Sequence, residues 1–434
     1  MKKLIVSFIY TTIILASCTA GHAMASVLDL EGAGRIALKN NPSIQAIQER
    51  LIQAGETVKQ ARAAYAPSLD ASGGFATIDN ARSSGQADID GQYKTTLSAT
   101  WLVFDGFNRE LTLQSTREAR MGAVEAGNNA RRLLLLAVAQ SFNTVQLAQE
   151  IMATVRADIT YYNRQLADAR AKREVGTGSL SDVLGIQVLV NGSQAALITA
   201  EKESRIALTG LAALLGYGES QLPKGMALSS LEDNLPRNTR LPDLEGLIQE
   251  AVHNRPDLKQ FNHKLRQAEK NIGMAKSGFY PAVSLNGSWN GEREGNAALE
   301  TKDFGYAAGI SISMNLFSGG LTKSKVAAAQ AAVRESELEL ANQKITIREE
   351  VTSAWYELES AARQFDLRKA NTDLVRQNRD LVEAEFKAGK NSLVSLTKAQ
   401  SELIKNRSQY LQAAANFQLA LNKIKAYTGD NLLR

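Results

Sequence analysis

The 434-residue sequence is poor in the residues on which catalytic and metal centres are most often built. Cys18 is its only cysteine, and its three histidines are His22, His253 and His263. A Cys/His zinc site or a histidine-based catalytic triad therefore has little to draw on. Neither a P-loop nor a dinucleotide-binding glycine motif occurs. We expect no enzyme, no cofactor and no bound metal, so any energy source must belong to a partner.

Proline is equally scarce. The chain holds seven prolines, and none lies between Pro67 and Pro223 or after Pro281. Such stretches allow long helices, which the abundant alanine, leucine, glutamine, glutamate and arginine favour. The formal net charge is only +5. No strongly basic stretch stands out, which argues against a nucleic-acid partner.

The N-terminus has the pattern of an export signal. Two lysines precede an apolar run from Leu4 to Leu15, which is too short to span a membrane as a helix. The small residues of Ala23–Ala25 offer a cleavage site, and we expect residues 1–25 to be a signal peptide. The alternative is lipidation at Cys18, because Leu15-Ala16-Ser17-Cys18 resembles a bacterial lipobox. Either route exports the chain, and a mature chain without Cys18 has no disulfide.

An internal duplication organises the rest of the sequence. Pro42 matches Pro256 at an offset of 214, and Phe104 matches Phe317 at an offset of 213. The chain then divides into residues 26–217, the first repeat; residues 218–242, a linker; and residues 243–434, the second repeat.

Each repeat is expected to form a helix, two strands, a very long helix and a final helix. Period-two alternation of apolar and polar residues predicts the strands. They are expected at about residues 68–76, 93–104, 282–290 and 304–317. The long helices are predicted at roughly Asn108–Glu174 and Leu321–Phe386. At about 1.5 Å per residue each would be close to 100 Å long, so each needs partner helices along its length.

Two similar glycine-containing segments interrupt the helical pattern and predict helical hairpins with matching tips. They are residues 175–187 and 388–400. Gly176 corresponds to Gly389. Ser179 and Ser392 are placed to cap the helices that follow, since serine is favoured at helix N-caps.

The four predicted strands pose a structural problem. Each has one apolar and one polar face, and four strands cannot close a barrel. An open sheet exposes two edges, which lipid does not tolerate. Apolar-out, polar-in alternation is typical of outer-membrane barrels, and three copies would supply about 12 strands. The alternatives are a soluble sandwich for the strands and a scaffold coiled coil for the helices.

This combination resembles the TolC family of outer-membrane efflux and secretion channels. The resemblance rests on the helix breaks at Asn41-Pro42 and Arg255-Pro256, on F-D-G at Phe104 and F-S-G at Phe317, and on V-G-T-G-S-L-S-D-V-L from Val175. It implies a mainly α fold and a homotrimer. A 12-stranded β-barrel in the outer membrane would continue as a long periplasmic α-helical barrel. The implied partners are outer-membrane lipids, a periplasmic adaptor and an inner-membrane transporter, which we expect to be of the ABC type.

The resemblance also implies that the hairpin tips close the periplasmic end of the channel. Asp182 stands where the family has an acidic residue in its first tip. The tyrosine, arginine and two acids of the second tip are replaced here. The expected gate residues are Asp182, Phe386, Lys390, Asn391, Ser395 and Lys398. We predict that Asp182 pairs with Lys390 or Lys398; the alternative is that Asp182 only caps its helix.

Two further groups of residues are expected to meet the surroundings of the channel. The tip positions expected to dock the adaptor are Val175, Gly176, Gly178, Ser179, Leu180, Gly389, Ser392 and Leu393. The aromatic residues expected at the membrane interface are Tyr93, Trp101, Trp289, Phe304 and Tyr306. Their alternative role is ordinary packing on the barrel surface.

The predicted function is that of a passive, trimeric exit duct. The first tip resembles those of type I protein-secretion members, so protein secretion is the favoured interpretation. The alternative is a duct for small molecules, drugs or metal ions, served by a proton-driven pump. An alternative of another class is an exported structural coiled coil without a pore.

Overall fold

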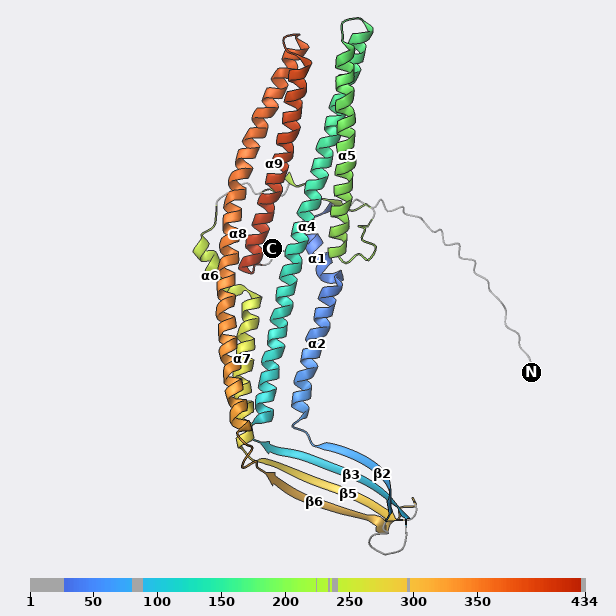
Figure 1. Ribbon diagram of the computed structural model, residues 1–434, viewed down its shortest axis with the longest axis vertical. Helices are drawn as coiled ribbons and strands as arrows, with labels where there is room; N and C mark the ends of the chain where they lie inside the picture. The colour runs from blue at the N-terminus through green and yellow to red at the C-terminus, as the bar shows by residue number, and fades with distance from the viewer. Residues whose placement is uncertain are drawn as a thin grey trace, which may run out of the picture.

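The computed structural model describes residues 27–79, 89–223, 225–232, 235, 241–294 and 297–430. It is an elongated molecule in which long helices rise from one end of a twisted sheet (Figure 1). The first repeat consists of α1 (Leu30–Asn40), α2 (Pro42–Ala63), β2 (Ser68–Asp79), β3 (Ile89–Asp105), α4 (Asn108–Glu174) and α5 (Leu180–Leu214). The second consists of α6 (Leu244–Asn254), α7 (Pro256–Lys276), β5 (Ala282–Glu294), β6 (Phe304–Ser313), α8 (Leu321–Lys387) and α9 (Leu393–Thr428). The mainly helical, duplicated fold with a sheet part is confirmed.

The helices are arranged as two antiparallel hairpins. Helix α4 pairs with α5, and α8 pairs with α9, while the shorter α2 and α7 extend the bundle toward the sheet (Figure 1). Helix α7 of the second repeat packs against α4 of the first as well as against α8. The two repeats therefore share one continuous helical body.

Proline sets the break between the first two helices of each repeat. Pro42 and Pro256 each begin a helix, and the residue before each is extended, with ψ of 122° at Asn41 and 124° at Arg255. A residue before proline is disfavoured in the helical region, so the chain bends there. Asn41 also accepts a hydrogen bond from the Ser43 amide and donates one to the Leu214 carbonyl. The hydrogen bond to Leu214 connects the bend at Asn41 to the C-terminal end of α5.

The segment between the repeats is more ordered than a linker. Strand β4 (Ala227–Leu228) lies parallel to β1 (Val27–Leu28). Leu231 is fully buried in the core between α8 and α9. Gln146 of α4 donates a hydrogen bond to the Ser229 carbonyl, so the described part of this segment crosses and holds both hairpins.

The sheet has the strand order β2-β3-β5-β6, antiparallel throughout. Three strands are longer than predicted, because main-chain pairing continues beyond the alternating side chains, for example from Thr77 to Gly91. Strand β6 is shorter. We predicted that it reached Phe317, but it ends at Ser313, opposite Ala282. Pro281 ends the partner strand there, since proline cannot donate to the ladder.

The two faces of the sheet differ sharply. Cross-strand register places Leu97 beside Trp289 and Trp289 beside Tyr306 on one face. The opposite face carries pairs such as Ser98 with Ser288. One face is therefore apolar and the other rich in hydroxyl groups. Within the described residues, β2 and β6 each have one unpaired edge.

The two passages from strand to long helix also differ. Only Gly106 and Phe107 separate β3 from α4, and both have positive φ, 66° and 68°. Arg109 fixes this turn by donating to the Asp105 carboxylate and to the Val103 and Ala64 carbonyls. Residues 314–320, by contrast, connect β6 to α8 without pairing in the sheet.

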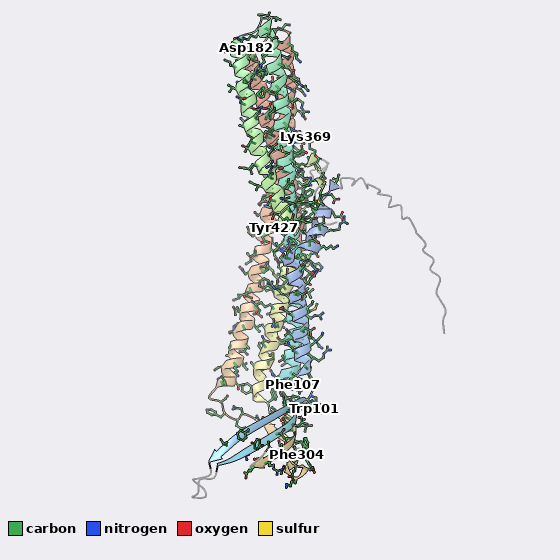
Figure 2. All side chains as sticks on the ribbon, turned by 90° about the vertical axis from the view of Figure 1, so that its right-hand side faces the viewer. Trp101, Phe107, Asp182, Phe304, Lys369 and Tyr427 are labelled. Atoms are coloured by element: carbon green, nitrogen blue, oxygen red, sulfur yellow. The ribbon has the colours of Figure 1, made fainter. Side chains whose placement is uncertain are left out.

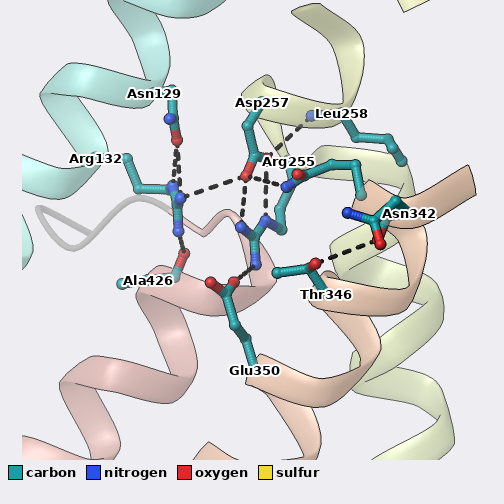
Figure 3. Close-up of polar contacts among 10 residues, drawn as sticks. Asn129, Arg132, Arg255, Asp257, Leu258, Asn342, Thr346, Glu350 and Ala426 are labelled. Carbon is teal, nitrogen blue, oxygen red and sulfur yellow. Dashed lines mark hydrogen bonds and ion pairs between the residues drawn. The ribbon is translucent and has the colours of Figure 1, made fainter. Parts of the chain in front are cut away.

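A buried charged cluster joins the repeats where α4, α7, α8 and α9 meet (Figure 3). Arg255, which is 2% exposed, pairs with both Asp257 and Glu350. Arg132 of α4 donates to the Ala426 carbonyl of α9 at 2.9 Å and lies 3.9 Å from Asp257. Burial alone would raise the pKa of Asp257, but hydrogen bonds from Arg255 and its positive charge outweigh burial and lower it. The carboxylate therefore stays charged and paired at neutral pH.

Replacing Arg255 with alanine leaves Asp257 and Glu350 without their buried partner. We expect a clear fall in the temperature at which the protein loses helical structure, because breaking a buried pair costs about 3–5 kcal/mol. Circular dichroism during heating in detergent measures it. The control is Arg348→Ala, which removes a mostly exposed partner of Glu245, an ion pair of the kind that adds little stability. Equal melting of the two variants would contradict the assignment.

Candidate functional site

The tip between α4 and α5 is a tight turn built on glycine. Gly176 has φ of +78°, and the Thr177 and Gly178 amides both donate to the Lys172 carbonyl. A Cβ on Gly178 would lie 2.9 Å from the Arg173 amide nitrogen, so the turn excludes larger residues. Ser179 then caps α5 by accepting a hydrogen bond from the Ser181 amide at 3.0 Å.

The tip between α8 and α9 follows the same plan. Gly389 has φ of +72°, and Ser392 caps α9 by accepting from the Ser395 amide at 3.2 Å. Asn391 donates to the Glu385 carboxylate at 2.9 Å and accepts from the Ser392 amide at 2.8 Å. Two predicted gate residues, Asn391 and Ser395, thus hold their own turn in shape.

A cavity of about 260 Å³ lies between the two tips. Its lining includes Asp182 and Phe386, and Lys172 stands 5.0 Å above the centre of the Phe386 ring. Such cation–π contacts are worth about 0.5–1 kcal/mol where exposed. Leu393 packs against a buried cluster of the first tip around Ile186. Apolar packing and one cation–π contact therefore join the tips within the chain.

The predicted charge pair does not form within the chain. Asp182 is exposed, and among the described residues it makes no ion pair with Lys390 or Lys398. Both lysines are exposed, and neither lines the cavity. A pair of this kind would have to join two copies of the chain.

Further from the tips, a polar network connects all four long helices, and sequence reasoning missed it. Asp158 of α4 accepts hydrogen bonds from Ser193 of α5 and Gln400 of α9, each at 2.9 Å. Arg379 of α8 donates to Gln400 at 3.4 Å and lies over the ring of Tyr161. Burial, followed by the nearby Glu383 carboxylate, raises the pKa of Tyr161 to about 12.

The duplication held a signal for this network. Asn371 and Asn406 occupy the positions of Asp158 and Ser193 in the second repeat, and they too are hydrogen-bonded, at 3.4 Å. The signal for the network in the sequence was therefore a pair of polar residues at matched positions of the two repeats, on helix faces that are otherwise apolar.

The predicted interface aromatics all lie on the apolar face of the sheet. Tyr93 packs on Phe75, with ring centres 4.8 Å apart, and Trp289 stacks on Phe304 at 4.5 Å. Tyr306, beside Trp289, is 90% exposed. All of them except Trp101 gather toward the end of the sheet far from the helices, where Figure 2 shows Phe304.

Trp101 belongs to a second aromatic group at the helix end of the sheet (Figure 2). Its indole nitrogen donates to the Tyr65 carbonyl at 2.9 Å. The other members, which the sequence analysis missed, are Phe104, Phe107 and Tyr280 in successive edge-to-face contacts. The signal available in the sequence was that each of the three lies within two residues of the end of β3 or the start of β5.

The spacing of the two aromatic groups matches a bilayer. Tyr93 and Phe104 are eleven residues apart on β3, which corresponds to roughly 37 Å along a strand. At the roughly 45° tilt of barrel strands this gives about 26 Å across the membrane, close to the roughly 25 Å apolar band of outer-membrane barrels.

The remaining predictions concern residues without a comparable arrangement. No group of three metal-ligating side chains occurs among the residues that the structure describes. His263 contacts the Glu118 carboxylate at 2.7 Å, an intramolecular contact between α7 and α4. The predicted signal peptide, residues 1–25, and the alternative lipidation site at Cys18 lie outside the described residues.

Comparison with known proteins places the chain in a family. The family described as outer membrane efflux protein matches residues 34–217 and 247–430, once per repeat. The toluene efflux pump outer membrane protein TtgC of Pseudomonas putida is 25% identical over 366 residues, covering 79% of this chain and 71% of its own. The outer membrane efflux protein BepC of Brucella suis is 22% identical over 413 residues, 93% of this chain and 86% of its own.

Solved structures show the same fold. A structure of CusC superposes with a TM-score of 0.80 at 20% identity, covering 93% of this chain and 92% of its own. The open state of the Neisseria gonorrhoeae MtrE outer membrane channel superposes with a TM-score of 0.79 at 18% identity, covering 93% and 89%. The predicted resemblance to TolC-like channels is confirmed at the level of the family.

Channels of this family form trimers that dock with periplasmic adaptors and inner-membrane pumps. They lie in the outer membrane with a periplasmic extension. With both of its repeats matched almost end to end, the chain belongs to the outer membrane efflux protein family.

Proposed function

We propose that the chain is one subunit of a trimeric duct through which a tripartite pump exports small molecules. The observation that carries the trimeric duct is the four-stranded sheet with one apolar face and two unpaired edges among the described residues. In lipid, unpaired backbone groups cost several kcal/mol each, so the edges must meet other strands. Three copies would supply twelve strands, an even number within the range of outer-membrane barrels.

The exposed surfaces of the helices support contact between copies along the periplasmic part. Exposed leucines on α8 recur at seven-residue steps, at positions 367, 374 and 381, the spacing of a coiled-coil seam. Helix α5 exposes Leu184, Val188 and Ile198. By length and composition α5 could even cross a membrane. One side of α5 packs against α4 in the helical body. We therefore assign the exposed apolar side of α5 to contacts with helices of neighbouring copies, and not to a membrane.

Small-molecule efflux fits the relatives better than the type I protein secretion favoured from the first tip. TtgC is named for toluene efflux, SrpC of Pseudomonas putida for solvent efflux and ArpC of that species for antibiotic efflux. We therefore adopt the alternative from the sequence analysis. An ABC-type partner is no longer favoured, since it was tied to protein secretion. The inner-membrane partner supplies the energy, because the chain contains no nucleotide-binding motif.

We also propose that the two tips form the periplasmic aperture and the adaptor-docking surface. The tips present exposed residues, including Val175, Leu180 and Val394, at the far end of the molecule from the sheet. Asp182 is exposed beside the cavity between them. It is therefore placed to contribute its charge to an aperture formed by several copies.

Deletion of the gene tests the efflux proposal. We expect the deletion strain to become more sensitive to organic solvents and to amphiphilic antibiotics, and the restored gene to reverse this. Growth at graded concentrations measures it. Heat-modifiable trimers in the outer-membrane fraction provide the control for assembly. Unchanged sensitivity together with loss of a secreted protein would favour secretion, and a soluble periplasmic rod would identify a structural coiled coil.

Asp182→Asn tests the aperture. We expect the ratio of cation to anion permeability to fall by up to about fivefold, since interactions of exposed charges are worth at most about 1 kcal/mol. Single-channel recording in planar bilayers measures both permeability and conductance fluctuations. Glu219→Gln is the matched control, an exposed carboxylate beyond the far end of α5. If both variants conduct like the parent protein, Asp182 acts only on its own helix, where it is the acidic residue of the first turn.

A further inference from the structure

The helix ends that meet the sheet carry an excess of positive charge. We compare the seven residues at each of these four ends, 57–63, 108–114, 270–276 and 321–327. They contain seven basic residues and one acidic residue, Glu110. The same length of helix at the four tip ends, residues 168–174, 180–186, 381–387 and 393–399, contains five of each. Of the two ends of the helical body, only the one nearest the sheet carries this excess.

Helix stability does not explain the most prominent of these charges. Lys323 and Lys325 lie in the first turns of α8, where the macrodipole favours acidic side chains. The first turn of α8 contains no acidic residue. Both lysines are exposed, and neither forms an ion pair within the described part of the chain. They are placed against the local electrostatic preference and without an intramolecular partner.

A third lysine lies close to these two. A Cβ on Gly278 would approach the Thr322 side chain to 3.1 Å, so the end of α7 and the start of α8 are in close contact. Lys276 precedes Gly278 by two residues and Lys323 directly follows Thr322, so both belong to this junction. Lys276 is also exposed and forms no ion pair within the described part of the chain. The three lysines form a cluster at one helix junction.

An apolar rim separates this cluster from the sheet. Its large side chains are exposed in the single chain: Phe279, Tyr280, Leu316, Phe317 and Leu321. Aromatic and apolar residues next to lysines are typical of the boundary between the hydrocarbon and the headgroups of a bilayer. Lysine stems lie along apolar surface while the ammonium group reaches the polar layer.

We propose that Lys276, Lys323 and Lys325 form a site that binds anionic phospholipid headgroups in the periplasmic leaflet of the outer membrane. The second aromatic group, with Trp101 and Phe107, marks the edge of the apolar band at this end of the sheet (Figure 2). The first turns of α8 are therefore expected at headgroup depth. Charges on the bilayer surface act there over a Debye length of about 8–10 Å. The site rests on the membrane location of the family and does not depend on what the channel exports.

Tryptophan quenching by brominated lipids tests this site. In a background of Trp289→Phe and Trp355→Phe, Trp101 is the remaining tryptophan and lies at this end of the sheet. We expect brominated phosphatidylglycerol to quench it at a lower fraction of the bilayer than brominated phosphatidylcholine does. Replacing all three lysines with glutamine should weaken that preference at least fivefold, since each basic residue near an anionic surface contributes about a fivefold factor.

Two matched triple variants and one competitor complete the experiment. Glutamine at Lys344, Lys369 and Lys405 makes the same charge change at exposed sites on α8 and α9, and should leave the preference intact. Figure 2 shows Lys369 far along the helices from Phe107. Arginine at the three junction positions should preserve the preference. Inorganic phosphate at constant ionic strength should not compete.

Three results would overturn the proposal. One is equal quenching by the two lipids in the parent protein, and another is an unchanged preference in the junction triple variant. The third is an equal loss of preference in the distant triple variant at Lys344, Lys369 and Lys405, which would assign the effect to net charge and not to the junction. Trimers of normal heat-modifiability in every variant establish that each has folded.

Discussion

The structure depends on the requirement that backbone hydrogen-bonding groups be paired wherever the chain meets lipid. In the described part of the chain the larger sheet has four strands, which leave an edge open on β2 and on β6. That deficit makes the sheet of one subunit incomplete by itself, and α5 and α8 separately leave apolar surface exposed. Neighbouring copies that pair with the open edges of the sheet can also bury the exposed faces of α5 and α8. Formation of one trimer would therefore complete the sheet and cover these helix faces together.

Periodic patterns in the sequence predicted most of this architecture. Alternation placed the strands from Ser68, Ala282 and Phe304, and proline placed the helix breaks at Asn41 and Arg255. Strand ends were missed because main-chain pairing ignores side-chain pattern. Burial of Leu231 was missed because one apolar residue in an aperiodic segment gives no signal.

The tips were harder to predict than the fold, because their chemistry depends on which residues meet across the hairpins. Asp158 and Gln400 lie 242 positions apart, and only the register of four helices brings them together. The Asp182–lysine pair was proposed from charge alone, whereas within the chain the tips meet through Lys172 on Phe386 and through Leu393. The duplicated sequence thus fixes where the tips lie, while side-chain register decides how they touch.

The unequal passages from sheet to helix have a mechanical consequence. Helix α4 follows β3 after two residues, in a turn held by Arg109, so little backbone lies between them to absorb a rotation of α4. Helix α8 follows β6 after the unpaired residues 314–320. Because this connector is longer and forms no sheet hydrogen bonds, it allows more rotation of α8 relative to β6. Each subunit therefore joins its sheet to its long helices by one short, hydrogen-bonded turn and one longer connector. A twist applied at the tips would reach the sheet more directly through α4 than through α8.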